Sequence, residues 1–444
     1  MYPKFKYIVL SLFLFIASLA FAQQNSRSPY SLFGVGALRY DGFADNIATG
    51  RNGISYRHES NFTFTNPASL SALKHATFNV GTYIELGQFH TNTVVQNFSN
   101  AGFNYIALGI PLKKIKSGLG FGLLPYSDVG YNIINSKDSA GISVRNEFEG
   151  MGGLSKFNLS FGSNPWKYLS LGFNYSYLFG ELNESMRRQY PGNRFIKNYA
   201  DINQTYLSGH HLDLGIQLHT ISNTGLSHAF GAVLSNNSKL KGERDRVVYN
   251  YIHVFADDEE SFRDTLYEEQ DKATSITLPH SLSLSYTIGN HEKWQATLGY
   301  SKTLWSKYIN VFGGNSGFSD DQGFSAGFFI CPRPNFDPMN KDASKRNYFQ
   351  SIRYAAGVRH NTGYINALGN TISESALSVG LGFPFTKYHK NYDGSRTIIT
   401  SRVFITGEFV RKGTTSSDLI EENFFRLTLG LNLADNWFKK RLFN

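Results

Sequence analysis

The sequence predicts an all-β fold, a 14-stranded antiparallel transmembrane β-barrel with an N-terminal hatch segment in its lumen. Two observations carry this prediction. An apolar leader marks the chain for export, and side chains then alternate with period two in 14 runs between residues 77 and 433. After the leader, no segment reaches the ~18 consecutive apolar residues of a membrane-spanning helix. Aromatic residues make up 15% of the chain, which is high for a soluble enzyme.

The first 22 residues have the parts of a secretory signal peptide. Lys4 and Lys6 form a charged start, Tyr7 to Leu19 an apolar core, and Ala20-Phe21-Ala22 an A-x-A cleavage site. The apolar core is too short for a retained membrane helix. We therefore expect residues 1–22 to be removed and the mature chain to be exported.

Residues 23–75 lie between the leader and the first strand and show no sustained period. The stretch from Ser28 to Leu73 mixes aromatic and polar residues and is rich in glycine. A segment of this kind, placed directly before regular strands, is expected to fold against a larger structure. We predict that it forms a hatch inside the barrel and that Asn66, Pro67 and Ala68 are part of this hatch.

The predicted strands each have one apolar face and one small or polar face. Every second residue from Leu169 to Phe179 is apolar, for example, and Ser170, Gly172 and Asn174 lie between them. Several runs reach ten residues, the length of a membrane-spanning strand, whereas strands of a soluble sandwich centre on about five or six. The predicted strands are residues 77–87, 103–112, 118–134, 155–163, 168–179, 209–220, 226–239, 276–289, 294–305, 323–331, 349–361, 376–385, 398–412 and 423–433.

The connections between these strands support a membrane barrel. An even strand number is usual in single-chain bacterial barrels, and their periplasmic turns are short while their external loops are long. Short connections follow the even-numbered strands here, and longer ones follow the odd-numbered strands, the longest at about 240–275. The connections 332–348 and 386–397 are long for periplasmic turns. We expect the barrel over residues 76–434 and a periplasmic tail over 435–444.

The tail contains a candidate periplasmic anchor. Trp437 and Phe438 are followed by Lys439, Lys440 and Arg441. Aromatic residues beside basic ones are typical of a membrane interface. The same run also fits a tail that docks on a partner protein.

Leu124 and Pro125 interrupt the third predicted strand. Proline has no N–H to donate to a strand ladder, so we expect a bulge or a kink in the wall here. Such a kink either opens a lateral gap in the wall or is a bend without further consequence.

No side-chain pattern in the sequence predicts catalysis, a metal or a cofactor. His211, Asp213 and His219 share a strand face, but the two histidines are about 26 Å apart along a strand, so a metal site is not expected. Ser208, His210 and Asp213 are sequence neighbours that would have to converge from one strand to form a hydrolase site. No Gly-x-Ser-x-Gly elbow or His-Glu-x-x-His helix is present.

Charge suggests lipid and protein partners more than nucleic acid. The net charge of +9 is mild for 444 residues and needs no nucleic-acid partner, and it suits a surface beside the lipid and lipopolysaccharide of an outer membrane. The acidic residues between Asp257 and Asp271 leave open a loose calcium site in an external loop. The single cysteine, Cys331, excludes a disulfide framework, and we expect its thiol to be inert.

These features resemble the FadL/TodX family of outer-membrane transporters for hydrophobic compounds. The resemblance rests on the signal peptide, the irregular segment with Asn66-Pro67-Ala68 and the 14 strands. The opening Ser28–Gly36 and the closing runs Asn423–Arg426 and Asn436–Arg441 are similar to the branch common in Bacteroidota. The resemblance implies an outer-membrane location, an Asn-Pro-Ala stretch in a plugging hatch, and a lateral opening at a kinked strand.

Two functions follow as expectations, and neither is enzymatic. The first is FadL-like passive passage of hydrophobic small molecules across the outer membrane. The alternative is a non-transporting accessory or plug subunit of a larger outer-membrane complex, such as a protein secretion translocon, with outer-membrane or periplasmic proteins as partners. The polar inward faces make this alternative a serious one, and they leave room for a local apolar pocket near the hatch. Relatives in the branch tend to carry a Gly-Gly-type run where this chain has Ala48–Gly53, and Arg51 there either pairs with a luminal carboxylate or faces water.

Overall fold

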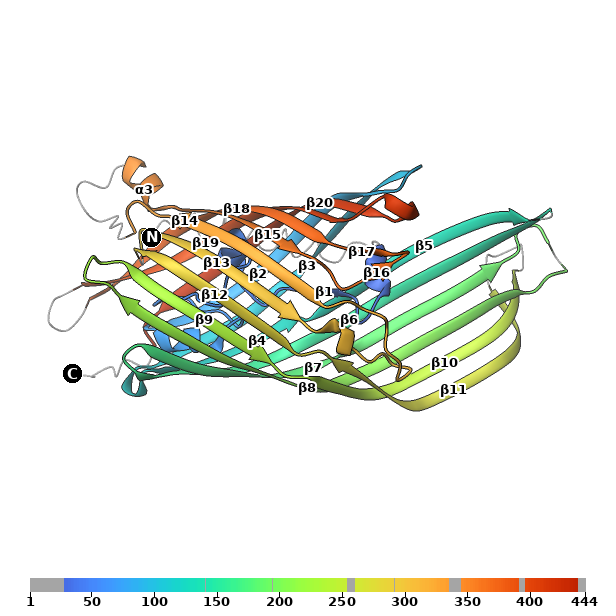
Figure 1. Ribbon diagram of the computed structural model, residues 1–444, viewed down its shortest axis with the longest axis horizontal. Coiled ribbons are helices and arrows are strands. Elements are labelled where there is room, and N and C mark those ends of the chain that lie inside the picture. Colours follow the sequence, from blue (N-terminus) through green and yellow to red (C-terminus); the bar gives the residue numbers. More distant parts are fainter. Residues whose placement is uncertain are drawn as a thin grey trace.

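The strands of the chain close into one ring. The computed structural model describes residues 28–139, 141–193, 195–253, 260–290, 292–334, 345–390 and 396–437. Neighbouring wall strands pair antiparallel, and the last strand, β20, pairs with the first, β2, along its whole length. The prediction of a 14-stranded antiparallel barrel is confirmed (Figure 1).

Eleven wall strands are continuous, and three are divided into two pieces. The continuous strands are β2 (Ala76–His90), β3 (Val95–Leu112), β6 (Ile142–Trp166), β7 (Leu169–Gln189), β8 (Asn198–Ile221), β13 (Trp294–Thr303), β14 (Asp321–Ile330), β15 (Arg353–Asn361), β18 (Glu374–Lys390), β19 (Arg396–Gly413) and β20 (Glu421–Asp435). The divided strands are β4 (Ser117–Pro125) with β5 (Ser127–Ser139), β9 (Ser227–Ser235) with β10 (Ser238–His253), and β11 (Glu260–Leu278) with β12 (Ser281–Asn290).

Short elements occupy the connections. They are the 3₁₀-helices η3 (Lys113–Ile115), η4 (Trp305–Lys307) and η5 (Ser416–Asp418), the helix α3 (Lys345–Ser351), and the two-residue strands β16 (Asn366–Ala367) and β17 (Asn370–Thr371). Helix α3 overlaps the start of the predicted strand 349–361, which therefore begins later, at Arg353. No helix in the described part of the chain is long and apolar enough to cross a membrane.

The wall has apolar side chains outside and polar side chains inside. On β7, Phe173 and Tyr177 are exposed on the outer face, whereas Asn174 and Ser176 are buried on the inner face. Backbone groups in lipid must be paired within the protein, and ring closure pairs them. This arrangement explains the one-sided alternation in the sequence. The chain is an outer-membrane β-barrel.

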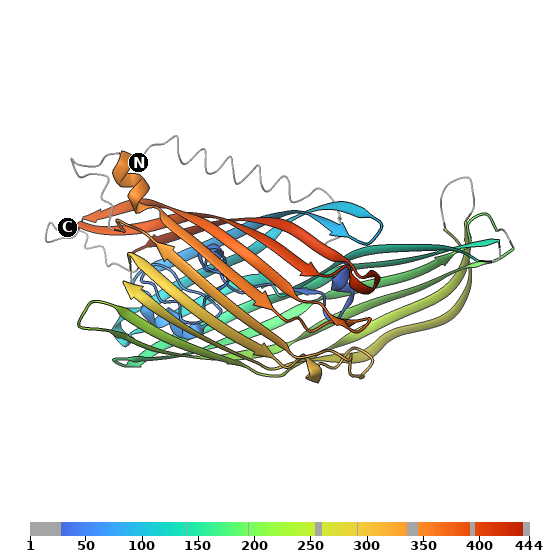
Figure 2. The same cartoon turned by 45° about the horizontal axis from the view of Figure 1, so that its top comes forward.

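Residues 28–75 lie inside the ring, and we call them the N-terminal segment (Figures 1 and 2). Its elements are η1 (Pro29–Leu32), β1 (Ala37–Leu38), α2 (Ala44–Ala48) and η2 (Pro67–Ala72). Helix η2 contacts β4, β6, β7 and β8, while α2 contacts β15, β18, β19 and β20. These strands lie on different arcs of the ring, so the segment spans the lumen from one wall to another.

The prediction of a long external loop at about 240–275 is wrong. Strands β10 and β11 occupy most of this range and, with the outer halves of β5 to β8, extend the wall well beyond the other strands (Figure 2). Side chains on this extension are polar on both faces, as Arg244, Glu269 and Glu147 illustrate. Beyond the membrane no face has to be apolar, so the alternating pattern that revealed the other strands is missing here.

Candidate functional site in the lumen

The Asn-Pro-Ala motif begins η2 and anchors it to the wall. The Asn66 side chain is buried, its Oδ1 accepts a hydrogen bond from the Ala68 N–H at 3.0 Å, and its Nδ2 donates to the carbonyls of Ile54 and Ile216 at 2.7 and 3.2 Å. Pro67 occupies the first helical position, where its missing N–H has no partner to lose. Each residue of the motif therefore satisfies a local requirement of the helix start.

Glycines of the wall let η2 approach closely. A Cβ atom at Gly215 of β8 would lie 2.2 Å from Asn66 Oδ1, and one at Gly172 of β7 would lie 2.5 Å from the Ala68 nitrogen. No side chain fits in these positions without moving the helix. The small residues on the inner face of β7 and β8 are thus part of the seat of the N-terminal segment.

An aromatic cluster packs the second half of the N-terminal segment, from Phe43 onward, against β3 and β4. Phe43 packs on Phe62, Phe64 and Tyr105, with ring centroids 4.6–5.8 Å apart. Leu124, from the predicted kink, is buried in the same cluster. This apolar contact attaches the segment to β3 and β4.

Ion pairs form a continuous network across the lumen. Glu408 on β19 lies at its centre, with its side chain only 1% exposed. It accepts from Arg51 of the N-terminal segment at 3.1 and 3.2 Å and from Arg426 on β20 at 3.1 Å, and Arg359 on β15 lies 3.6 Å away. Arg359 also pairs with Glu374 on β18. The buried carboxylate is therefore neutralised by arginines from three different elements.

Arg39 extends this network across the break between β4 and β5, the two pieces of the third wall strand. Its Nη1 lies 3.3 Å from Glu85 on β2, its Nη2 donates to the Tyr83 hydroxyl at 2.6 Å, and its Nε pairs with Asp128 on β5. Glu85 in turn pairs with Arg426 at 2.6 Å. One side chain of the N-terminal segment thus connects β2 with β5, which share no ladder hydrogen bonds.

Burial lowers the pKa of two arginines of the segment. Burial, followed by the charge of Arg359, lowers the pKa of Arg51 to about 10. Burial also lowers the pKa of Arg57 to about 10, and its Nη1 donates to the neutral groups of Ser170 and Gln217 at 2.9 Å. Both side chains stay charged at neutral pH, and both tie the segment to the wall.

A cavity of ≈ 470 Å³ lies between the N-terminal segment and the wall. Charged side chains form one side of it, and small polar residues of β12, β13 and β14 form the other. The charged lining includes Arg39, Arg51, Glu85, Arg359, Glu374 and Arg426, and the small lining includes Ser281, Ser283, Ser301 and Ser325. Pockets for hydrophobic ligands are mostly apolar with few polar groups. This cavity combines its charged groups with apolar side chains such as Phe64, Tyr300 and Phe424.

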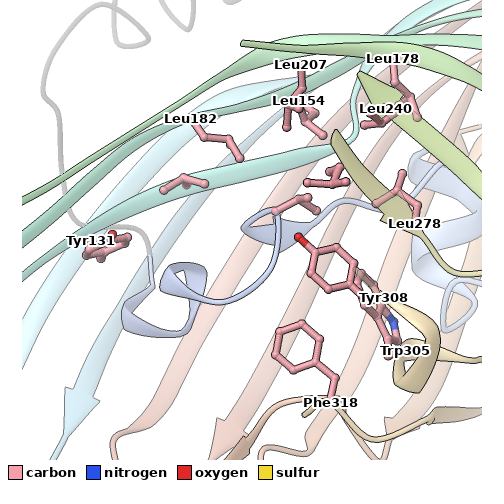
Figure 3. Packing of buried hydrophobic residues seen from close by; sticks show 13 residues of the cluster. Tyr131, Leu154, Leu178, Leu182, Leu207, Leu240, Leu278, Trp305, Tyr308 and Phe318 are labelled. Carbon is pink, nitrogen blue, oxygen red and sulfur yellow. The ribbon is translucent and has the colours of Figure 1, made fainter. Parts of the chain in front are cut away.

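External loops cover the outer side of the segment. Trp305, Tyr308 and Phe318 from the β13–β14 connection are buried, and Trp305 stacks on Tyr364 with ring centroids 4.1 Å apart. They belong to one cluster with Val35 of the segment. Figure 3 shows these aromatic side chains on one side of the segment and leucines of the wall strands on the other. These loop residues therefore pack on the outer side of the segment.

A family model named BamG matches residues 4–444, almost the whole chain. The chain belongs to the BamG family. No curated protein matched its sequence. The BamG-family chain is also similar in fold to solved outer-membrane proteins, which confirms the FadL/TodX resemblance at the level of structure.

Three solved structures illustrate the likeness of the BamG-family chain. The Pseudomonas putida toluene transporter TodX is 14% identical, with a TM-score of 0.56 and coverage of 92% of this chain and 100% of that one. The CymD monoaromatic hydrocarbon channel is 12% identical, with a TM-score of 0.54 and coverage of 91% and 99%. A FadL homologue from Pseudomonas aeruginosa is 9% identical, with a TM-score of 0.54 and coverage of 89% and 98%. At this identity the likeness concerns the fold alone.

The predicted hydrolase and metal candidates of the BamG-family chain do not come together. Ser208 and His210 lie on the outer face of β8 and Asp213 on the inner face. His211 lies 3.0 Å from Asp213, whereas His219 is within 3.2 Å of Asn164 and Ser170. No group of three metal-ligating side chains occurs among the described residues.

Other predicted sites of the BamG-family chain lie partly outside the described residues. Residues 257–259 of the acidic run are among these, and farther along Glu269 pairs with Arg244 and Lys272 on the extended wall. In the tail, Trp437 is exposed, and Phe438, Lys439, Lys440 and Arg441 lie outside the described part. The leader, residues 1–22, does so as well and stays a prediction.

Apart from Arg51, the residues of the luminal ion-pair network of the BamG-family chain were not predicted from the sequence. Nothing in the sequence indicated that Arg426 pairs with Glu85 and Glu408. A usable signal was present, since buried charged residues within a membrane-spanning strand, such as Arg402 and Glu408 on β19, mark a functional or structural site. Arg51 pairs with a luminal carboxylate, the first of its two expected alternatives.

Proposed function

We propose that the chain is a non-transporting accessory subunit of an outer-membrane complex that contains other BAM proteins. The BamG family name supports an association with BAM proteins of the outer membrane. The observation that carries the proposal is the attachment of the N-terminal segment to the wall inside the ring. The N-terminal segment is held to β5, β2, β20 and β19 by one ion-pair network, and external loops pack over it.

The ion pairs that hold the N-terminal segment to the wall disfavour transport as the main function. Moving the segment out of the lumen would separate Arg51 from Glu408 and Arg39 from Glu85, although Arg426 on the wall would still pair with both carboxylates. Removing one partner of a buried ion pair costs roughly 3–5 kcal/mol. A passive channel has no energy source to offset several such losses in each passage event.

Passive passage of hydrophobic small molecules is the second candidate. It is supported by the fold, which is that of solved proteins titled as hydrocarbon channels and toluene transporters, and by the interruption of the wall between β4 and β5. The charged side chains that share the cavity lining with apolar ones argue against it, because pockets for hydrophobic ligands hold few polar groups.

Purification from the native outer membrane in a mild detergent distinguishes the two candidates. We expect an affinity-tagged chain to bring down BAM proteins in stoichiometric amounts, identified by mass spectrometry. A second tagged outer-membrane barrel of similar abundance, prepared in parallel, controls for non-specific co-purification. Recovery of a monomer with a hydrophobic molecule in its lumen would overturn the subunit proposal.

A further inference from the structure

Arg57 of the N-terminal segment forms no ion pair within the part of the chain that the structure describes. The other arginines of the segment, Arg39 and Arg51, bind carboxylates of the wall strands. Arg57 is partly buried, and burial alone lowers its pKa to about 10, so the side chain stays charged at neutral pH. A charge removed from water is costly unless an opposite charge lies beside it. A ligand that supplies this opposite charge would explain why an arginine occupies the position.

Neutral oxygen atoms hold one nitrogen of Arg57 in place. Its Nη1 donates to Ser170 Oγ and Gln217 Oε1 at 2.9 Å and to Ser71 Oγ at 3.4 Å. Ser170 and Gln217 are buried, and the amide nitrogen of Gln217 donates to two backbone carbonyls of the segment, which fixes the direction of its oxygen. The guanidinium is therefore oriented before any ligand binds, which lowers the entropy cost of binding.

The other edge of the same guanidinium is open. Nε and Nη2 of Arg57 have no acceptor among the described residues and, unlike Nε of Arg353 and of Arg402, they are not fully buried. These two nitrogens form an edge that binds a carboxylate through two parallel hydrogen bonds. The same edge of Arg51 binds Glu408 in this way, at 3.1 and 3.2 Å. Arg57 therefore presents a preoriented edge for an anion.

Arg57 lies near one end of the barrel. Its partner Ser170 is the second residue of β7 and follows the turn at residues 167–168, and Ser71 is close to the end of η2. The turn between β6 and β7 is one of the short connections that predict the periplasmic end of the barrel. We therefore expect a ligand of Arg57 to come from the periplasm.

A single carboxylate fits this site better than a phosphate. Arg57 supplies one positive charge, and the groups that hold its Nη1 are neutral. A carboxylate carries one negative charge and balances the arginine. A phosphate monoester carries nearly two and would leave an excess of negative charge in a partly buried place.

We propose that Arg57 binds an acidic side chain, Asp or Glu, of a protein partner that enters the periplasmic end of the barrel. Two charge-assisted hydrogen bonds from Nε and Nη2 hold the carboxylate and compensate the charge of the arginine. The partner is thereby bonded to the N-terminal segment as well as placed beside the wall. This inference rests on the proposed function as a subunit and identifies one contact of that subunit.

Carbodiimide crosslinking tests the contact directly. Arg57→Lys places an amine at this position, and a water-soluble carbodiimide joins an amine to a carboxylate that touches it. The tagged variant is crosslinked in outer membranes, purified and digested, and the linked peptides are identified by mass spectrometry. We expect position 57 to be linked to an Asp or Glu of a different protein. Lys74 is the internal control, because it pairs with Glu59 and should be linked within the chain. Links from position 57 only to carboxylates of this chain would overturn the inference.

Removal of the charge provides a second readout that does not depend on the crosslinker. Arg57→Gln should lower the amount of co-purified partner by at least about tenfold, because the carboxylate of the partner loses its opposite charge. Lys74→Glu changes the charge of a side chain in the same segment that is 62% exposed, and it should leave the amount unchanged. Heat-modifiable migration on gels and limited proteolysis verify that the barrel and the segment of each variant are folded.

The outcomes separate this contact from the proposed function. Undiminished partner with Arg57→Gln, an equal loss with Lys74→Glu, or the loss of a bound phospholipid instead of a protein would overturn the contact at Arg57 alone. Absence of any partner in the wild-type preparation would overturn the proposed function itself.

Discussion

Arg51 of the N-terminal segment and Glu408 of β19 form a two-pronged ion pair, with Nε–Oε1 at 3.1 Å and Nη2–Oε2 at 3.2 Å. Arg51 holds this contact from a left-handed backbone conformation, with φ of +63°. Non-glycine residues enter this region at a cost of about 1–2 kcal/mol. The pair therefore compensates a strained backbone at the point where the segment reaches the opposite wall.

Glu408→Gln should destabilise the barrel by roughly 3–5 kcal/mol, because Arg51, Arg359 and Arg426 then share no central carboxylate in a buried site. The change is measured as a lower unfolding temperature by heat-modifiable gel migration in detergent. Glu421→Gln is the control, since its partner Arg411 is 65% exposed and such pairs contribute about 0–1 kcal/mol. Equal stability of the two variants would show that the network contributes little.

Arg51→Gly and Arg51→Ala separate the backbone strain from the ion pair. Both remove the contact with Glu408, but glycine adopts a positive φ without the steric cost that alanine has. The glycine variant should therefore be more stable than the alanine variant by about 1 kcal/mol. Equal free energies of unfolding in urea for the two variants would show that the backbone at position 51 relaxes without cost. The positive φ would then impose no strain.

The 14 wall strands were predictable because lipid imposes one rule on each of them. Leu169 to Phe179 must be apolar on one face, and the pattern is visible without knowledge of any neighbour. The same rule fails beyond the membrane, where β10 and β11 have polar residues on both faces. Pro125 predicted the interruption of the third strand, and Pro279, which separates β11 from β12, carries the same signal.

The luminal network was not predictable from local pattern. Arg51 and Glu408 are 357 positions apart, and their pairing depends on where the N-terminal segment lies within the closed ring. The contact of Asn66 with Ile216 is of the same kind. Alternation indicates which side chains face inward, but only the fold decides which inward side chains meet.

Asn66→Ala should destabilise the N-terminal segment by about 1–3 kcal/mol, because the Ala68 N–H and the Ile54 carbonyl lose a buried partner. Limited proteolysis of the detergent-solubilised protein should show faster cleavage within residues 28–75. Asn370→Ala removes exposed hydrogen bonds in an external loop and serves as the control. Equal cleavage rates in both variants would contradict an anchoring role for Asn66.

Gly172→Ala should displace η2 from its seat, because the added Cβ would lie 2.5 Å from the backbone nitrogen of Ala68. Overpacking of this kind costs about 1–3 kcal/mol. Gly314→Ala is the matched control, since its nearest neighbours lie 3.8 Å from the added atom or beyond. Unfolding temperatures of the two variants provide the comparison, and an unchanged value for Gly172→Ala would mean that the helix does not press on β7.

Cys331 should react slowly with maleimide in the folded protein. The residue directly follows β14 and is 1% exposed, its Sγ lies 3.3 Å from the Ser351 carbonyl, and burial raises the pKa of the thiol. Since the thiolate is the reactive form, both the raised pKa and the lack of access lower the rate at neutral pH. Labelling should rise steeply after unfolding in SDS, whereas a cysteine introduced at the open Gly314 should label at once in both states. Rapid labelling of Cys331 in the folded protein would mean that the rim between β14 and α3 opens readily.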